Sequence, residues 1–289
     1  MLRNVSIVLL AQIPLAILPA LPGGARWAAA GVWGLLNGWL ISELLGPRGR
    51  VFGAAVWKGS PQPRVALTFD DGPHPEDTPA ILEILSKAGA RATFFFVGEK
   101  ARRHPDLVRR VAAAGHEVAA HSDTHPWWFS LAPPGRVARE VSVSADTLRG
   151  LAGRAPVHFR PPVGHKSIFL EEPLRACGMR LVTWSSRSYD TLRRSPESIL
   201  RATLATAAPG GIVLLHEGVR RQPGEPSPTV AALPRLLEAL RARGLEPVSL
   251  EDLRADRAAP SPPDPGAPAA AARGARAGSP PPGAASSPG

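Results

Sequence analysis

From residue 64 to residue 250 the chain alternates short apolar runs with longer amphipathic stretches, and this alternation is the strongest constraint on its fold. The runs short enough to be strands are Val65–Phe69, Ala92–Val97, Glu117–Ala120, His158–Arg160, Arg180–Trp184, Gly211–His216 and Glu246–Leu250. The helical stretches between them are Asp77–Ala88, Pro105–Ala114, Pro134–Leu151, Ser167–Ala176, Pro196–Ala207 and Pro228–Arg243. Strands that alternate with helices favour parallel β/α units. We therefore predict an α/β fold, a distorted (β/α) barrel of about seven units, with an open doubly wound sheet as the alternative.

Two apolar stretches precede this region, residues 5–22 without any charge and residues 27–45 with only Glu43. Each is just long enough to cross a bilayer, and the short Gly-containing link between them suits a helical hairpin. Two spans, one span with a re-entrant or interfacial piece, and a cleaved signal peptide all remain open. We predict one or two N-terminal membrane helices and attachment to the cell (inner or cytoplasmic) membrane.

The side of the membrane is read from the flanking charges. More positive residues follow the second stretch than occupy the link, where Arg26 stands alone; those that follow are Arg48, Arg50, Lys58 and Arg64. If both stretches span, this bias places the main domain on the cytoplasmic side. Pro14 and Pro19 weaken that premise, so the side stays open.

Composition divides the chain and excludes several function classes. We predict membrane segments over 1–45, a linker over 46–63, the α/β domain over 64–254 and a disordered tail rich in Pro, Ala and Gly over 255–289. The net charge is +10, but no Lys/Arg block is interleaved with aromatic residues, so we expect no nucleic-acid partner. The single cysteine, Cys177, excludes an intrachain disulfide and a cysteine-based metal site. No Gly-rich dinucleotide or nucleoside-triphosphate motif follows the first strand.

Polar clusters lie where the predicted strands end, which is where barrels and open α/β sheets form their sites. Asp70 and Asp71 follow the first strand, and taken alone they would be an ordinary acidic turn. His121 and His125 follow the third strand, four residues apart. If this loop takes one helical turn, both imidazoles face one way, and a carboxylate completes a set typical of zinc sites. One carboxylate of the pair can then hold the metal while the other faces a water.

Four motifs in this order resemble the motif series of the polysaccharide deacetylases, the family 4 carbohydrate esterases with a NodB-homology domain. They are Thr68–Pro73, His121–Pro126, Arg160–Gly164 and Leu214–His216. The resemblance covers about residues 64–250, some two thirds of the chain. It implies a distorted (β/α) barrel and a hydrolase of non-peptide carbon–nitrogen bonds. The implied activity is metal-dependent removal of N-acetyl, or O-acetyl, groups from a polysaccharide or a lipid-linked sugar.

The resemblance also implies roles for individual residues. Asp71, His121 and His125 match the metal ligands, with zinc as the expected ion. Asp70 matches the general base, Arg160 the arginine that orients that base, and His216 the general acid. Leu215 matches the residue that lines the acetyl pocket.

The chain departs from the family pattern at two motifs. Val163 stands where an aromatic residue is common, and its backbone N–H is expected to face the oxyanion. The family's Asp-x-x-Asp-Trp motif corresponds to residues 184–191, where Asp190 is expected to orient His216. Trp127 and Trp128 are expected to stack on sugar rings or lie at the membrane surface, with capping of the barrel core as the alternative. The expected partners are a carbohydrate substrate and the lipid bilayer, and the competing hypothesis is a non-catalytic, membrane-tethered glycan-binding module.

Overall fold

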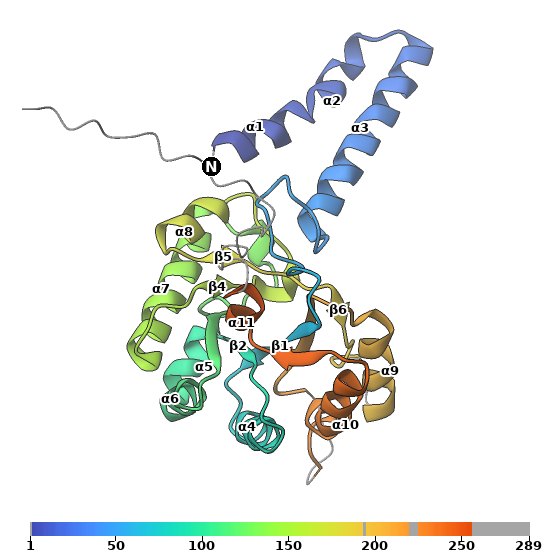
Figure 1. Ribbon diagram of the computed structural model, residues 1–289. Coiled ribbons are helices and arrows are strands. Elements are labelled where there is room, and N and C mark those ends of the chain that lie inside the picture. The colour runs from blue at the N-terminus through green and yellow to red at the C-terminus, as the bar shows by residue number, and fades with distance from the viewer. Residues whose placement is uncertain (1, 193–194, 220–224, 256–289) are drawn as a thin grey trace, which may run out of the picture.

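The computed structural model describes residues 2–192, 195–219 and 225–255 (Figure 1). Its strands are β1 (Arg64–Gly72), β2 (Thr93–Phe96), β3 (Glu117–Ala120), β4 (His158–Phe159), β5 (Arg180–Leu181), β6 (Ser186–Arg187), β7 (Gly211–His216) and β8 (Glu246–Val248). They form one sheet in the order β5-β4-β3-β2-β1-β7-β6, and β8 also pairs with β1. Every pairing is parallel. Because no pairing joins β5 to β6 in the described residues, the curled sheet is an incomplete barrel, which confirms the predicted fold.

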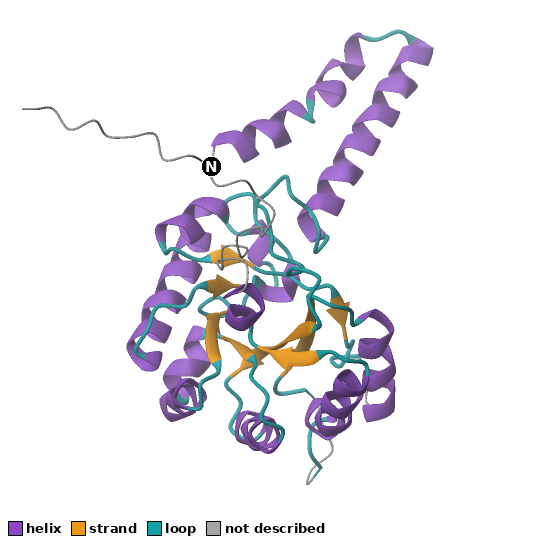
Figure 2. Cartoon of the chain, viewed as in Figure 1, coloured by secondary structure: helices purple, strands orange, loops and turns teal. Residues whose placement is uncertain are grey.

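Helices surround this sheet (Figure 2). The α-helices of the barrel are α4 (Asp77–Lys87), α5 (Gly98–Arg103), α6 (Pro105–Ala113), α7 (Pro134–Ala152), α8 (Glu171–Ala176), α9 (Pro196–Thr206), α10 (Pro228–Ala242) and α11 (Leu250–Ala255). Two short 3-10 helices, η2 (Phe129–Leu131) and η3 (Pro162–Gly164), lie in loops. The sequence did not predict α5, α11 or β6, because such short elements contain too few residues to establish a hydrophobic periodicity.

The helix predicted from Ser167 begins only at Glu171, so that part of the prediction is wrong. Residues 166–170 are occupied instead in contacts with the N-terminal region. The Lys166 ammonium is fully buried and donates to the carbonyl oxygens of Glu43, Gly46 and Gly49 at 2.8–2.9 Å. The Ile168 carbonyl, which a helix would bond internally, accepts a hydrogen bond from Asn4 at 2.8 Å instead.

The two faces of β1 have different partners because side chains alternate along a strand. Val65, Leu67 and Phe69 pack in the core between the sheet and the outer helices. Ala66 faces the other way and joins a smaller cluster with Phe95 inside the barrel. Asp70 is four residues from Ala66, so the same alternation carries its carboxylate to the open end of the barrel interior.

An apolar helical hairpin projects from the barrel (Figure 1). It consists of α1 (Leu2–Leu10), α2 (Ile13–Ile17), η1 (Leu18–Ala20) and α3 (Gly23–Leu45). Its two arms are joined through Gln12, which donates to Asn37 at 3.0 Å and accepts from Trp33 at 2.9 Å. Arg3–Ala20 and Gly23–Leu45 are each long and apolar enough to cross a membrane, which is compatible with an anchor and equally with a signal sequence.

The base of the hairpin is fastened to the barrel. Beside the Lys166 clamp, Asn4 donates to the Ile168 carbonyl at 2.8 Å, and the Thr183 hydroxyl donates to the Pro47 carbonyl at 2.6 Å. The segment over 46–63 also lies against the barrel, where Phe52 is buried and Val56 bridges to β5's neighbour Val182. The predicted disordered tail lies, from residue 256 onward, outside the described residues.

Candidate active site

A bulge at the end of β1 brings two adjacent carboxylates to one site. The pairing with β2 skips Asp71, because Asp70 lies opposite Phe95 and Gly72 opposite Phe96. Asp71 has φ 69°, a left-handed conformation that a non-glycine residue adopts at a cost. In a regular strand the two side chains would point to opposite faces. The extra residue turns Asp71 back, so both carboxylates approach the Nε2 atom of His121, at 3.9 Å from Asp70 and 3.4 Å from Asp71.

The loop after β3 supplies two imidazoles without a helical turn. Ser122 and His125 both have positive φ, at 64° and 54°, so the expected helical turn is wrong. The buried Glu140 of α7 holds the loop by accepting hydrogen bonds from the backbone of Asp123 and Thr124, both at 2.8 Å. The two histidine rings nevertheless come together, with centroids 4.9 Å apart.

Asp71, His121 and His125 form a three-ligand cluster. The potential ligand atoms of the three side chains lie within 4.8 Å of one another. The Nδ1 atom of His121 is 2.7 Å from the Arg160 carbonyl oxygen, so it carries the proton and leaves the Nε2 lone pair facing Asp71. The imidazoles outweigh the effect of burial and hold the pKa of Asp71 well below its usual range. Two imidazole nitrogens and one carboxylate oxygen fit a divalent transition-metal ion.

Asp70 is held by a buried arginine. Arg160 follows β4, has no exposed surface and donates to Asp70 Oδ1 at 2.6 Å. The same guanidinium donates to Thr68 Oγ1 at 2.8 Å and to the Thr183 carbonyl at 3.0 Å, and it stacks on Phe95. These contacts leave the second oxygen of Asp70 facing the histidines.

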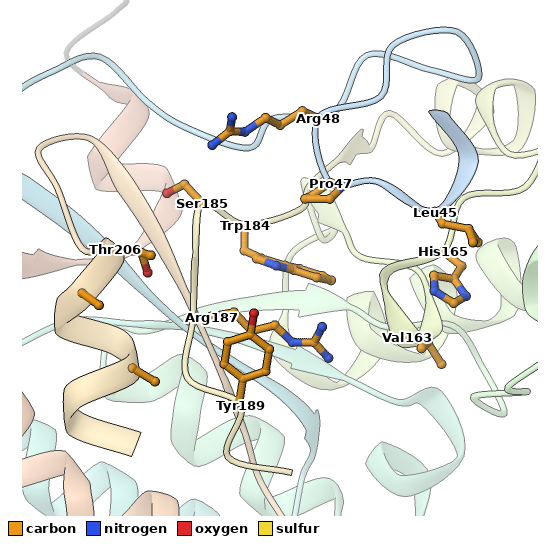
Figure 3. Close-up of a pocket in the computed structure, with 12 residues that line it drawn as sticks. Leu45, Pro47, Arg48, Val163, His165, Trp184, Ser185, Arg187, Tyr189 and Thr206 are labelled. Carbon is orange, nitrogen blue, oxygen red and sulfur yellow. The ribbon is translucent and has the colours of Figure 1, made fainter. Parts of the chain in front are cut away.

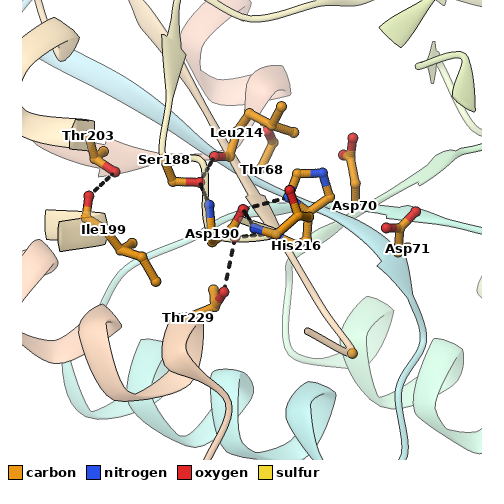
Figure 4. Close-up of polar contacts among 12 residues, drawn as sticks. Thr68, Asp70, Asp71, Ser188, Asp190, Ile199, Thr203, Leu214, His216 and Thr229 are labelled. Atoms are coloured by element: carbon orange, nitrogen blue, oxygen red, sulfur yellow. Dashed lines mark hydrogen bonds and ion pairs between the residues drawn. The ribbon is translucent and has the colours of Figure 1, made fainter. Parts of the chain in front are cut away.

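His216 and Asp190 form the second charged pair (Figure 4). His216 ends β7 directly beside Asp70 of β1. The buried Asp190 accepts from His216 Nδ1 at 2.7 Å, from the His216 backbone N–H at 2.7 Å and from the Thr229 hydroxyl at 2.9 Å. Burial lowers the pKa of His216, but the Asp190 carboxylate outweighs burial and raises this pKa to about 9. The imidazole is therefore protonated at neutral pH, with its Nε2 directed toward the site.

A cavity of about 160 Å³ collects these groups. Its lining comprises Asp70, Asp71, His121, His125, Val163, Gly164, Trp184, Arg187, Thr191, Leu214 and His216. Gly164 is required here, because a Cβ atom would lie 2.1 Å from the Trp184 ring.

Leu215 does not line this cavity, so that prediction is wrong. Side chains alternate along β7, and His216 faces the site. Leu214 therefore faces it too and lines the cavity, whereas Leu215 is buried in the core on the helix side.

The aromatic run after His125 is split between surface and core. Phe129 is fully buried against Phe159 and caps the core, whereas Trp127 and Trp128 are exposed and line no part of the cavity. Their roles stay predictions. Glu217, left without a role by the sequence, is buried beneath Gly72, and burial raises its pKa to about 8.

We expect Arg160→Met to lower the free energy of unfolding by roughly 3–5 kcal/mol, because it leaves the Asp70 carboxylate buried without its partner. Denaturant unfolding of the full chain in detergent measures this. Arg154→Met is the control, since it breaks an exposed pair with Glu251 at 2.7 Å and should cost under about 1 kcal/mol. Equal losses for both variants would contradict this account of Arg160.

Comparison with known proteins agrees with this geometry. Residues 58–182 match the family model described as polysaccharide deacetylase. A chitooligosaccharide deacetylase from Sinorhizobium fredii is 40% identical over 195 residues, covering 64% of this chain and 89% of the relative. The chain belongs to the polysaccharide deacetylase family. It is therefore a hydrolase of the carbon–nitrogen bonds of sugar acetyl groups.

Two further polysaccharide deacetylase relatives show the range of the family. A peptidoglycan-N-acetylglucosamine deacetylase from Bacillus cereus is 34% identical over 192 residues, covering 65% of this chain and 67% of the relative. The crystal structure of a family 4 pseudoenzyme from Bacillus anthracis superposes with a TM-score of 0.64 at 25% identity, covering 69% of this chain and 68% of that chain. The family thus contains named deacetylases and at least one named pseudoenzyme.

Sequence reasoning about this deacetylase missed five of the residues that line the cavity: Gly164, Trp184, Arg187, Thr191 and Leu214. Leu214 is next to Leu215, the residue that was predicted. Because side chains alternate along a strand, the residue two positions before His216 faces the same side as His216, and this rule would have identified Leu214. Trp184 was the last residue of the fifth predicted strand, and Arg187 lay in the polar run that follows it. With Asp190 at the second Asp of Asp-x-x-Asp-Trp, Arg187 occupies the first Asp position, a reversal of charge beside the site.

Proposed function

We propose that this chain is a membrane-anchored, metal-dependent deacetylase that removes N-acetyl, or O-acetyl, groups from a polysaccharide or a lipid-linked sugar. One observation carries the proposal. A three-ligand cluster, a carboxylate held by a buried arginine and a protonated histidine held by a buried aspartate converge on one small cavity. Metal-assisted amide hydrolysis uses a metal-binding set, a general base and a general acid in one place.

The metal ligands in this proposal are Asp71, His121 and His125. Their nitrogen-rich set favours zinc among the ions available to such a site. A divalent ion bound there would supply Lewis acidity and a more acidic water. The Arg160 carbonyl contributes by fixing the tautomer of His121.

The remaining residues move and hold protons. Asp70 takes a proton from the water that attacks the acetyl carbonyl carbon. Arg160 keeps the Asp70 carboxylate in position, and Thr68 accepts a hydrogen bond from the same guanidinium. The Val163 N–H donates to the oxygen that becomes negative. His216 then gives its proton to the sugar nitrogen as the C–N bond breaks. Water and amide are converted to acetate and amine, and Leu214 borders the space for the acetyl methyl group.

We expect acetate release from acetylated chito-oligosaccharides or peptidoglycan fragments to fall to background in chelator and to return when zinc is added. The physical reason is that the described site contains no other group able to activate water to the same extent. Acetate quantified with and without chelator checks this. Turnover unaffected by chelator would contradict the metal. No turnover of any acetylated sugar, in zinc-loaded protein, would favour the glycan-binding module.

Retention of the reactive groups is what supports an enzyme over a binding module. Asp70, His216 and the three predicted ligands are all present and converge, although a family relative is named a pseudoenzyme. We assign residues 64–254 as the deacetylase domain on the same ground, since all of these residues lie within that range and meet at one site.

The hairpin over 1–45 supports the anchor in this proposal. A reporter fused after Leu250 tests which side the domain faces, because the excess of Arg and Lys after the second apolar stretch favours the cytoplasmic side. Exported reporter activity would contradict that orientation.

A further inference from the structure

A second cavity adjoins the catalytic one. It has a volume of about 530 Å³ and shares Val163, Trp184 and Arg187 with the catalytic cavity as common walls (Figure 3). The walls that belong to this cavity alone include Leu45, Arg48, His165 and Tyr189. No residue of the proposed reaction except Val163 lines it, so the reaction itself leaves this cavity unexplained.

The cavity is basic. Arg48 and Arg187 line it, and none of the described residues that line it is an Asp or Glu. Arg187 stacks on Trp184 and Tyr189, at 5.7 and 5.0 Å from the ring centroids, and Arg48 stacks on Trp57 at 4.7 Å. Stacking uses the faces of the guanidinium groups and leaves their N–H edges available.

Arg187 supports this electrostatic description in two ways. Its Nε atom is buried and has no hydrogen-bond partner among the described residues, so no contact neutralises this donor. Burial and the charge of Arg187 also lower the pKa of His165, so the positive potential extends across the cavity. Arg187 is half-buried and Arg48 is exposed, and two arginines that line one cavity without a carboxylate create a positive potential that attracts an anionic ligand.

The cavity also lies at the base of the hairpin. Leu45 is the last residue of α3, and Pro47 and Arg48 follow it at once. The Lys166 clamp and the Thr183–Pro47 hydrogen bond fix this segment on the barrel, next to His165 and Trp184. If α3 crosses the bilayer, its end places Arg48 at the level of the lipid head groups. A ligand anchored in the same bilayer would present its head group there.

We propose that this cavity binds the phosphate of a saccharide that is joined through phosphate to a membrane lipid. The acetylated sugar would then reach the catalytic cavity across Trp184 and Arg187. This inference rests on the proposed function, since it names the substrate class for the same site. Arginine forks match phosphate oxygens by paired hydrogen bonds, and the aromatic rings hold those forks in place.

The test uses the full chain in detergent and three acetylated substrates that carry the same N-acetylated sugar. One is a polyprenyl phosphodiester, one a water-soluble methyl phosphodiester and one a neutral octyl glycoside. Arg48→Gln is expected to raise KM for the polyprenyl phosphodiester at least about tenfold, the loss of one charge-assisted contact. KM for the octyl glycoside is expected to stay unchanged, because Arg48 lies outside the catalytic cavity.

Arg50→Gln is the matched control, since Arg50 is exposed, carries the same charge two residues away and does not line the cavity. Equal KM changes for the two variants, or an equal change with the neutral glycoside, would overturn the phosphate site. A methyl phosphodiester turned over as well as the polyprenyl one would overturn the lipid-anchored source.

Binding of the polyprenyl phosphodiester, measured by retention on immobilised protein, separates this inference from the proposed function. If no substrate releases acetate but Arg48→Gln still weakens retention while Arg50→Gln does not, the deacetylase proposal fails and the phosphate site stands. Retention that is the same for wild type and both variants overturns the phosphate site, whatever the activity.

Discussion

Asp71→Ala is expected to abolish acetate release, by at least about 10³-fold in kcat, and to strip the protein of its metal. The carboxylate is the anionic member of the three-ligand cluster, 3.1 Å from His125 Nε2 and 3.4 Å from His121 Nε2. Its loss removes the charge that retains a divalent cation, and activation of water is lost with the cation. Acetate quantification and metal analysis of the purified variant measure the two effects on one sample.

Asp70→Asn is the matched control, because it changes the neighbouring carboxylate and keeps its shape. We expect kcat to fall about 10²- to 10⁴-fold, as for loss of a general base, while metal content stays at the wild-type level. The division of roles would be wrong if Asp70→Asn lost the metal, or if Asp71→Ala retained both metal and turnover.

Asp190→Asn is expected to lower kcat about 10²- to 10⁴-fold at neutral pH and to shift the alkaline limb of the pH profile downward. In the wild type, Asp190 holds the pKa of His216 at about 9, so the general acid is protonated at lower pH and is lost as pH rises through about 9. In Asp190→Asn, burial still lowers the pKa of His216 but the carboxylate that raised this pKa is gone, so the pKa of His216 falls. The dependence of kcat/KM on pH measures the shift.

Thr229→Val is the control for this prediction. The Thr229 hydroxyl donates to Asp190 at 2.9 Å, so the variant removes one hydrogen bond and leaves the charge in place. Its alkaline limb should move far less than that of Asp190→Asn. Identical limbs in Asp190→Asn and the wild type would show that another group sets the alkaline side of the profile.

Much of the architecture was predictable from local pattern. The strands β1, β3 and β7 were recognisable as apolar runs, and the amphipathic stretches between the strands as helices. β6 was not predictable, since two residues contain no periodicity. The helix expected from Ser167 failed because a local propensity was overridden by the contacts of Lys166 with the end of α3.

The site was predictable to the level of residue types and neighbouring strands. Placing polar clusters at strand ends brought Asp70, His121 and His216 together, because parallel strands end at the same edge of a sheet. The Leu215 error arose at a finer level. A motif match identified the strand segment that contains Leu215. Which face of the strand Leu215 occupies depends on its spacing from His216, and an odd spacing puts it on the opposite face.

The sequence by itself determined the order of strands and helices, the polar residues at the strand ends and the two apolar stretches before them. These depend on spacing and chemistry along the chain. Tertiary structure alone decided that Asp71 sits in a bulge, and so approaches His121 together with Asp70. It also decided that Lys166 fastens the end of α3 beside a basic cavity. Both features arise from contacts between segments far apart in the chain, and no local pattern contains that information.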